Sequence, residues 1–277
     1  AVSGDGRSVI ATNHIPLEPA TGTFVRSSVT FIDPDTLSST HAFLPDGSIN
    51  VHEICISPDG KRALATHGIG SYPLLTSQVD MGWINTSAVS IIDPINRKLH
   101  CNALLDDVSR GAANPWGVSF ADGNRFAVIT HSGTNEISVI DVEGMVEEVK
   151  DYTELVGPMD GDNLIIDHRR RIKLPGRGPR GLAVVWPRAF IAEYFTDTIA
   201  IVDLSDQSDD VKAATIRLGP PPIMSKVRKG EAWFHDATLC YQHWQSCASC
   251  HTGGRADALN WDLLNDGPVS PRNTKSL

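Results

Sequence analysis

The sequence of 277 residues is poor in positive charge and has no long apolar run. Its 24 Lys and Arg residues are outnumbered by 33 Asp and Glu residues, which gives a formal net charge of −9 and a pI near 5.5. Binding to nucleic acid needs clustered Lys and Arg, so the composition argues against a nucleic-acid partner. A membrane-spanning helix needs roughly 18 consecutive apolar residues, and we therefore expect no membrane span. The first residues also lack the basic start and apolar centre of a signal peptide.

Cysteine is scarce as well, and the five residues are an odd number, which excludes a complete disulfide framework. Cys55 and Cys101 lie in or beside apolar runs and are predicted to be small buried side chains. The other three, Cys240, Cys247 and Cys250, lie close together near the end of the chain. We therefore expect the chemistry of the protein in this C-terminal stretch.

Residues 1–219 contain a pattern that occurs four times. Each unit has a short apolar run, a turn, a second run that ends in a polar residue, a loop, and a third run that closes on an aspartate. The closing residues are Asp33, Asp93, Asp141 and Asp203. A further outer strand is predicted after each unit, at 40–44, 98–104, 170–174 and 213–218. Four short strands per unit are the make-up of a β-propeller blade, so the predicted fold class is mainly β, with four blades visible.

Details of the repeat agree with this prediction. Asp-Gly pairs in the units suit tight turns, because glycine adopts the positive φ that such turns require. The closing aspartates are expected to accept hydrogen bonds from backbone N–H groups of the following turn, and a metal site at them is the less favoured alternative. The units are unevenly spaced because of insertions at 13–27, 68–87 and 143–169, which are predicted to be loops. The stretch 142–155 is a candidate helix.

The repeats resemble the YVTN family of β-propellers, whose units read approximately V-S-P-D-G-x-x-x-Y-V-T-N and then V-S-V-I-D. In this chain, residues 56–60 read Ile-Ser-Pro-Asp-Gly and residues 89–93 read Val-Ser-Ile-Ile-Asp. The resemblance covers residues 1 to about 219 and implies a ring of about seven blades. Because Ala1 falls within an innermost strand, we expect the chain to be part of a longer ring with blades upstream. A closed ring of four blades is the alternative.

The repeated strand pattern ends after Gly219. Residues 220–222 are three prolines, which form a stiff linker, and residues 226–239 have the spacing of a helix. We therefore divide the chain into propeller blades at 1–219, a linker at 220–225 and a C-terminal domain at 226–277.

The five residues from Cys247 to His251 read Cys-Ala-Ser-Cys-His, the attachment motif of c-type haem. Two cysteines on one helical turn can form thioethers to both vinyl groups of a porphyrin, and the next residue, His251, becomes an axial ligand of the iron. One covalent haem c is therefore predicted, held by Cys247 and Cys250. Two alternatives remain: a zinc site, or a redox dithiol. The zinc site would be completed by residues from the set Cys240, His235 and His243.

The surrounding residues resemble bacterial cytochrome c domains, which open on G-x-x-x-F and continue to C-x-x-C-H. Here Gly230 and Phe234 have that spacing. Residues 254–257 (Gly-Arg-Ala-Asp) and 272–277 (Arg-Asn-Thr-Lys-Ser-Leu) resemble the di-haem cytochrome c peroxidase family. This resemblance implies electron transfer and peroxidase-type chemistry, although a second haem motif is not present. Arg255 is a candidate partner of a haem propionate, and a solvated surface charge is the alternative.

The sixth ligand of the iron is not evident from the sequence. The usual residue is a Met downstream of the motif, but all four methionines lie upstream of His251. The ligand is expected in sequence outside this chain; alternatively His235 or His243 serves, or the iron has an open position.

A second candidate site is predicted on one face of the propeller. Polar residues recur where the second strand of a unit ends and where the innermost strand begins, and loops of both kinds emerge on the same face. His52, His67 and His131 could there bind an anion, a metal or the cofactor of a partner. Ordinary polarity of the rim, with side chains bonded to backbone, is the alternative.

Together these features predict a secreted or periplasmic electron-transfer protein, because thioether attachment of haem in bacteria takes place outside the cytoplasm. Its partner would be a redox protein or a small-molecule electron donor or acceptor. The alternatives are a haem-dependent peroxidase or oxidoreductase, and a propeller interaction module without redox function.

Overall fold

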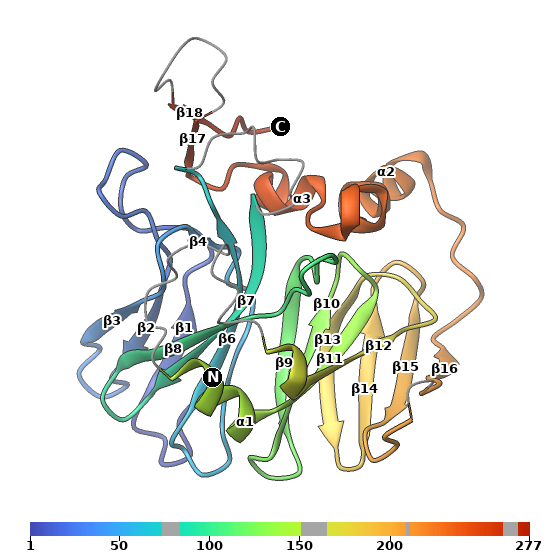
Figure 1. Ribbon diagram of the computed structural model, residues 1–277, viewed down its shortest axis with the longest axis horizontal. Coiled ribbons are helices and arrows are strands. Elements are labelled where there is room, and N and C mark those ends of the chain that lie inside the picture. Colours follow the sequence, from blue (N-terminus) through green and yellow to red (C-terminus); the bar gives the residue numbers. More distant parts are fainter. Residues whose placement is uncertain (74–83, 151–164, 209–210, 263–270) are drawn as a thin grey trace.

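The computed structural model describes residues 1–73, 84–150, 165–208, 211–262 and 271–277, and it is mainly β (Figure 1). Four antiparallel sheets follow one another along the chain and lie side by side. The first sheet contains β1 (Val9–Thr12), β2 (Ser28–Ile32) and β3 (Ser39–Phe43). The second contains β4 (Ser48–Ile49), β5 (Ile54–Ile56), β6 (Ala63–Gly70), β7 (Asn85–Asp93) and β8 (Lys98–Leu104). The third contains β9 (Pro115–Ala121), β10 (Phe126–His131), β11 (Glu136–Asp141) and β12 (Arg169–Lys173). The fourth contains β13 (Pro179–Val185), β14 (Arg188–Glu193), β15 (Thr198–Asp203) and β16 (Ala214–Arg217).

These sheets have the arrangement of propeller blades. In the third and fourth sheets each strand pairs with the next one along the chain, from the innermost strand to the outermost. The innermost strands β5, β9 and β13 are neighbours, since β9 contacts both of the others. Apolar side chains fill the spaces between adjacent sheets. One cluster joins the second sheet to the third through Val89, Ala127 and Ile129, and another joins the third to the fourth through Val128 and Ile191.

The turns have the predicted chemistry. Gly6, Gly60 and Gly123 follow the Asp of their Asp-Gly pairs and have φ values of 71°, 72° and 69°. The closing aspartates accept backbone hydrogen bonds, as predicted: Asp33 from the amide of Thr36 at 2.8 Å, and Asp203 from the amide of Ser205 at 3.0 Å. These bonds satisfy amides that would otherwise be left open at the strand ends.

The helix candidate of the third insertion is confirmed over its first half. Helix α1 (Val142–Val149) begins after Asp141, whose carboxylate accepts a hydrogen bond from the amide of Gly144. Residues 151–164 lie outside the described part of the chain.

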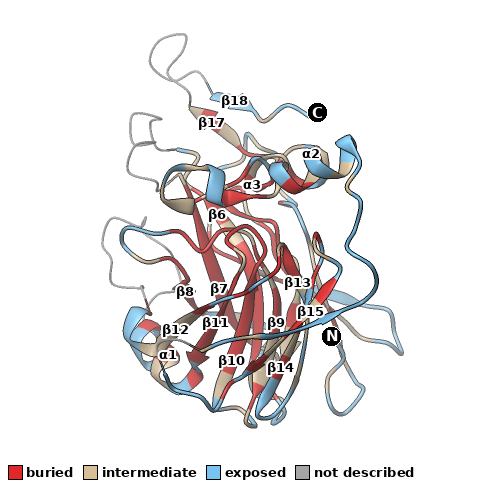
Figure 2. Ribbon diagram, turned by 90° about the vertical axis from the view of Figure 1, so that its right-hand side faces the viewer, coloured by how far each residue is buried: buried red, intermediate tan, exposed pale blue. Residues whose placement is uncertain are grey.

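The C-terminal segment lies across one end of the sheets and consists of short elements (Figures 1 and 2). They are α2 (Lys226–Phe234), the 3₁₀ turns η4 (Ala237–Leu239) and η5 (Tyr241–His243), α3 (Cys247–Cys250), η6 (Thr252–Gly254), β17 (Asn260–Asp262) and β18 (Pro271–Asn273). The helix predicted over 226–239 is thus shorter, because Asp236 has extended φ and ψ and its carboxylate caps η4 through the amide of Thr238. Among the described helices, none has the length and apolar character needed to cross a membrane.

Candidate functional site

The Cys-x-x-Cys turn forms the short helix α3, which is fixed at its start by two serines. The Ser246 side chain accepts a hydrogen bond from the backbone of Ser249, and the amide of Ser246 donates to Ser249 Oγ at 3.0 Å. This reciprocal capping box satisfies two amides that the helix itself leaves open. Cys247 and Cys250 therefore lie one turn apart on a helix that is defined by its own local bonds.

Three asparagines from the ends of the second and third sheets hold this helix. Asn50 Nδ2 donates to the carbonyl of Ser249 at 2.8 Å. Asn114 Nδ2 donates to Ser246 Oγ at 2.8 Å and its Oδ1 accepts from Ser249 Oγ at 2.7 Å. Asn85 Nδ2 lies 2.7 Å from Gln245 Oε1 and 3.3 Å from Cys250 Sγ. Asn50 follows β4 and Asn114 precedes β9, with φ of 56° and 55°, a conformation that asparagine tolerates better than most residues.

Other parts of the C-terminal segment are bonded to the remaining sheets. The Arg177 guanidinium, which precedes β13, pairs with Asp236, and the Arg228 guanidinium donates to the carbonyl of Tyr194 at 2.6 Å. At the far end, Asn260 Nδ2 donates to the carbonyl of Ala20 at 2.8 Å. The segment is thereby tied to loops from the first sheet to the fourth.

The His251 ring is oriented by the backbone. Its Nδ1 lies 2.9 Å from the carbonyl oxygen of Lys275 and 3.3 Å from that of Arg255. Carbonyl oxygens only accept, so the proton of the neutral ring is on Nδ1 and the lone pair is on Nε2. Among the described residues both hydrogen bonds of this ring use Nδ1, which leaves Nε2 to bind a metal.

The two thiols have different surroundings. Cys247 is exposed. Cys250 packs against an apolar cluster that contains Leu259 and Trp261, and burial raises the pKa of its thiol to about 11. The Cys250 thiol is therefore neutral near pH 7, and this environment disfavours the thiolate that a zinc site or a reactive dithiol requires. A thioether sulfur carries no charge and suits such surroundings.

Exposed apolar side chains gather in the same part of the chain. Val227 and Trp233 on α2 have relative exposures of 83% and 59%, and Leu239 and Tyr241 have 66% and 65%. Figure 2 shows that much of α2 is exposed, whereas the strands beneath the segment are buried. The Phe234 ring lies 6.4 Å from the ring of His251.

The residues of the zinc alternative do not assemble. Among the described residues, no three His, Cys, Asp or Glu side chains form a group that could hold a metal ion. The His235 ring contacts Phe234 and Phe195, with ring centroids 5.5 Å and 5.9 Å apart, and burial lowers its pKa to about 4. The His243 side chain lines a separate cleft.

His67 and His131 are buried inside their own sheets. Nε2 of each ring lies 2.7 Å from a serine hydroxyl of the adjacent strand, Ser90 and Ser138 respectively. Nδ1 of His67 lies 3.1 Å from the carbonyl of Gly68, and Nδ1 of His131 lies 2.9 Å from that of Ala112. Both nitrogens of each ring are thus engaged, and the two histidines hold adjacent strands together, in line with the alternative of ordinary polarity.

His52 belongs to a different group, in which side chains stack from one sheet to the next. Its ring lies 3.7 Å from the ring of Trp116, centroid to centroid, and 4.9 Å from that of His14. The Arg180 guanidinium lies 4.3 Å from the Trp116 ring and 4.0 Å from the Tyr194 ring. Burial, together with the charges of His14 and Arg180, lowers the pKa of His52 well below its usual range. His52 is therefore neutral, and the structure does not bring it together with His67 and His131 as a ligand set.

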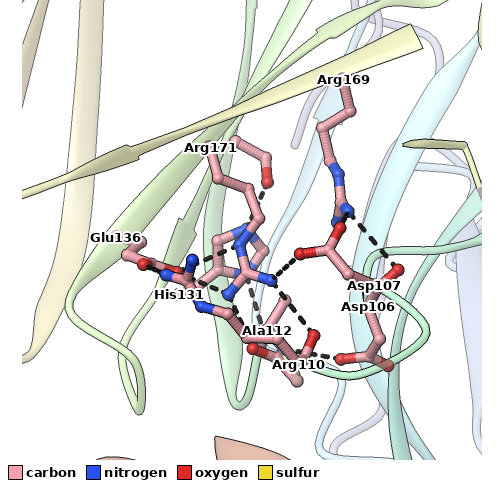
Figure 3. Close-up of polar contacts among 10 residues, drawn as sticks. Asp106, Asp107, Arg110, Ala112, His131, Glu136, Arg169 and Arg171 are labelled. Carbon is pink, nitrogen blue, oxygen red and sulfur yellow. Dashed lines mark hydrogen bonds and ion pairs between the residues drawn. The ribbon is translucent and has the colours of Figure 1, made fainter. Parts of the chain in front are cut away.

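A network of charged side chains supports the C-terminal segment from the third sheet (Figure 3). Arg171 on β12 pairs with Glu136 at 2.5 Å and with Asp107 at 2.7 Å, and Arg110 also pairs with Glu136. The loop that carries Asp107 and Arg110 then bonds to the segment, since the Gly111 amide donates to the carbonyl of Gln242 at 2.8 Å. A Cβ on Gly111 would lie 2.4 Å from backbone atoms of this segment, so the contact requires glycine.

Fold and site together define a propeller-type β protein with a Cys-x-x-Cys-His segment laid over the ends of its sheets. No family model matches the chain. Over 205 residues, 73% of its length, the chain is 23% identical to hydrazine synthase subunit beta of Kuenenia stuttgartiensis. The match covers 52% of that protein, so the chain spans about half the length of the curated relative.

Two solved structures are similar to this chain. The structure of Kuenenia stuttgartiensis hydrazine synthase matches with a TM-score of 0.58 and 22% identity, over 79% of this chain and 57% of that chain. A putative 6-phosphogluconolactonase from Bacteroides uniformis matches with a TM-score of 0.48 and 14% identity, over 79% of this chain and 56% of that chain. The first of these likenesses shows a shared fold.

Proposed function

We propose that this chain is an electron-transfer protein in which a c-type haem is attached to Cys247 and Cys250 and carried on propeller-type sheets. The observation that carries the proposal is the orientation of His251. Backbone carbonyls accept the Nδ1 proton, and Nε2 is left with its lone pair beside two cysteines on one helical turn. Metal-binding histidines are commonly held in this way, with the second ring nitrogen donating to a carbonyl.

The chemistry of the donor set fits a haem. Thioethers at Cys247 and Cys250 are neutral, which suits the buried position of Cys250. The exposed apolar side chains of α2 and the following turns, among them Trp233 and Leu239, offer surface that a porphyrin would cover. Arg255 is exposed and could pair with a propionate. When bound, the haem supplies an iron that takes up and releases one electron.

The residues of this chain then have defined tasks. Asn50, Asn85 and Asn114 fix the helix that carries the cysteines, and the carbonyl of Lys275 fixes the imidazole of His251, which would bind the iron. The chain contains one Cys-x-x-Cys-His motif, whereas the di-haem peroxidase family that its C-terminal residues resemble needs a second. We therefore favour electron transfer over peroxidase activity.

The proposal extends to compartment and partner. Covalent attachment of haem implies a periplasmic or secreted protein. The relative from Kuenenia stuttgartiensis is named as a subunit of hydrazine synthase, and by analogy we propose that this chain exchanges electrons with a partner protein.

Expression with and without the bacterial machinery for haem attachment tests the proposal. Denatured protein in alkaline pyridine should show the absorbance spectrum of haem c, and intact mass should show one haem per chain. Cys247→Ser and Cys250→Ser should each remove one thioether, whereas Cys240→Ser is the matched control and should keep both. Protein from the native host with free thiols at 247 and 250, or with bound zinc, would refute the proposal.

The state of the iron, with and without added peroxide, distinguishes the favoured function from its alternatives. An iron with both axial positions occupied, little affected by added peroxide, supports electron transfer. Turnover of peroxide with a measured rate would favour the peroxidase, and a folded chain that never acquires haem in its native host would favour an interaction module.

A further inference from the structure

A small cavity lies where the ends of the second and third sheets meet helix α3. Its lining combines residues from the sheets, such as His52 and Ser87, with Ser249 of α3. The space in it that the centre of a water molecule can reach is about 20 Å³, and roughly 10–15 Å³ is enough for one water. The cavity therefore has room for a water molecule and is too small for a larger ligand.

The ring of His52 has nitrogens that nothing in the described part of the chain uses. Its contacts are with other rings, at 3.7 Å from Trp116 and 4.9 Å from His14 between centroids. Neither ring nitrogen forms a hydrogen bond with a described residue. Because burial lowers its pKa, the ring is neutral, and a neutral imidazole has one donor and one acceptor. Both are available to a ligand in the cavity.

Other polar groups of the lining are available as well. Thr86 and Ser87 are buried, and their hydroxyls form no hydrogen bond with any residue that the structure describes. Asn50 and Asn114 each donate one side-chain N–H to the capped helix α3, and a primary amide has a second N–H to donate. A buried water typically forms about three hydrogen bonds, and this lining can supply them.

We propose that the cavity is a binding site for an ordered water molecule, which joins the ring of His52 to the asparagines that hold α3. The water accepts a hydrogen bond from the second N–H of Asn50 or Asn114 and donates one to the unprotonated nitrogen of His52. An apolar cavity of this size stays dry, whereas a polar one with several unused groups holds water. The inference does not rest on the presence of haem, so the two proposals can fail separately.

A high-resolution crystal structure of the chain gives the direct test. We expect a water in the cavity, within hydrogen-bond distance of a ring nitrogen of His52 and of the side-chain nitrogen of Asn50 or Asn114. A cavity without electron density would overturn the proposal.

The variant Gly68→Ala gives a test in solution. Gly68 lines the cavity, and a Cβ there would lie 3.7 Å from Ile49 Cγ1 and 3.7 Å from the carbonyl oxygen of Thr86. These are ordinary contacts, so the methyl group would take the place of the water and leave the His52 ring without a partner. Local opening of α3 admits bulk water to this ring, so the Ser249 and His251 amides should exchange about fivefold faster.

Gly181→Ala is the matched control. This glycine also lies in a strand, its added Cβ would meet Ala192 Cβ at 3.5 Å, and it does not line the cavity. Exchange of the two amides should therefore be as in the wild type. If the cavity is dry, the methyl group of Gly68→Ala fills empty space and slows the exchange. That result, or equal exchange rates in the two variants, would overturn the proposal.

Discussion

Replacing Asn114 tests how strongly the third sheet holds the cysteine-bearing helix. Asn114→Ala removes two hydrogen bonds, to Ser246 Oγ and from Ser249 Oγ, and each contributes about 1 kcal/mol. The free energy of local opening of α3 should therefore fall by about 2 kcal/mol. The residue also has a φ of 55°, where alanine costs about 1 kcal/mol. This backbone cost stays in the third sheet when α3 opens, and it lowers the free energy of global unfolding instead.

Native-state amide hydrogen exchange measures this opening directly. The amide of His251 donates to the carbonyl of Cys247, and that of Ser249 to the carbonyl of Ser246, so both report on α3. A loss of about 2 kcal/mol should speed their exchange by roughly thirtyfold. Asn114→Gly removes the same two bonds and accepts the positive φ, so it should speed this exchange equally but cost about 1 kcal/mol less in the free energy of global unfolding.

The amides of β14 and β15 provide the internal reference, because these strands lie in another sheet and should exchange as in the wild type. Exchange of the His251 and Ser249 amides that is unchanged in both variants would refute the reasoning, since the asparagine bonds would then contribute nothing to holding the helix. Equal free energies of global unfolding for the alanine and glycine variants would refute the reasoning about the backbone conformation alone.

Three further predictions concern stability, and urea unfolding measures each of them. Burial raises the pKa of Asp106 from 3.8 to about 6, so the folded state holds this proton more tightly. The free energy of unfolding should therefore fall by about 2 kcal/mol between pH 4 and pH 7, and Asp106→Asn should remove that slope. Gly111→Ala places a Cβ 2.4 Å from the backbone of the C-terminal segment and should destabilise the protein by about 2 kcal/mol or more. Its control is Gly230→Ala on α2, where the added Cβ meets no other atom. This control should stabilise the protein by up to about 1 kcal/mol. Ser138→Ala leaves the buried Nε2 of His131 without its partner and should lower the free energy of unfolding by about 1–3 kcal/mol. An unchanged free energy of unfolding would contradict the conclusion that His131 holds adjacent strands together.

Much of the fold could be predicted from the sequence because its pattern is local. Most paired strands follow one another along the chain, so alternating apolar residues and Asp-Gly turns were sufficient to place most of them. The β12 strand predicted over 170–174 spans Arg169–Lys173, for example. The loop predicted over 68–87 is wrong at both ends, because β6 continues to Gly70 and β7 begins at Asn85, where the two strands go on pairing with each other. The end of α2 was harder to predict. The helical spacing of the sequence continues beyond Asp236, but the chain leaves the helix there and the Asp236 side chain caps the next turn.

The site was only partly predictable. The Cys-x-x-Cys-His motif is contiguous and could be read directly, whereas its supports come from far along the chain. Asn50 and Asn85 could not be predicted as contacts of this helix, since an isolated asparagine near or within a strand can have many different roles. The orientation of His251 depends on a carbonyl of Lys275, and no side-chain pattern encodes a backbone contact. His67 and His131 were placed in a face site from their recurrence, but the same recurrence has a structural cause in the serines of the adjacent strand.

The separation in sequence of the bonds that hold α3 has a kinetic consequence. Most paired strands within a sheet follow one another along the chain, whereas the bond between Asn50 and Ser249 spans 199 residues and that between Asn114 and Ser249 spans 135. Such long loops are slow to close, so during synthesis the four sheets can form while the Cys-x-x-Cys-His stretch is still undocked. If haem is attached as proposed, Cys250 would be open to the attaching enzyme in that interval, before it packs against its apolar cluster. The order of folding and attachment would then follow from the chain itself.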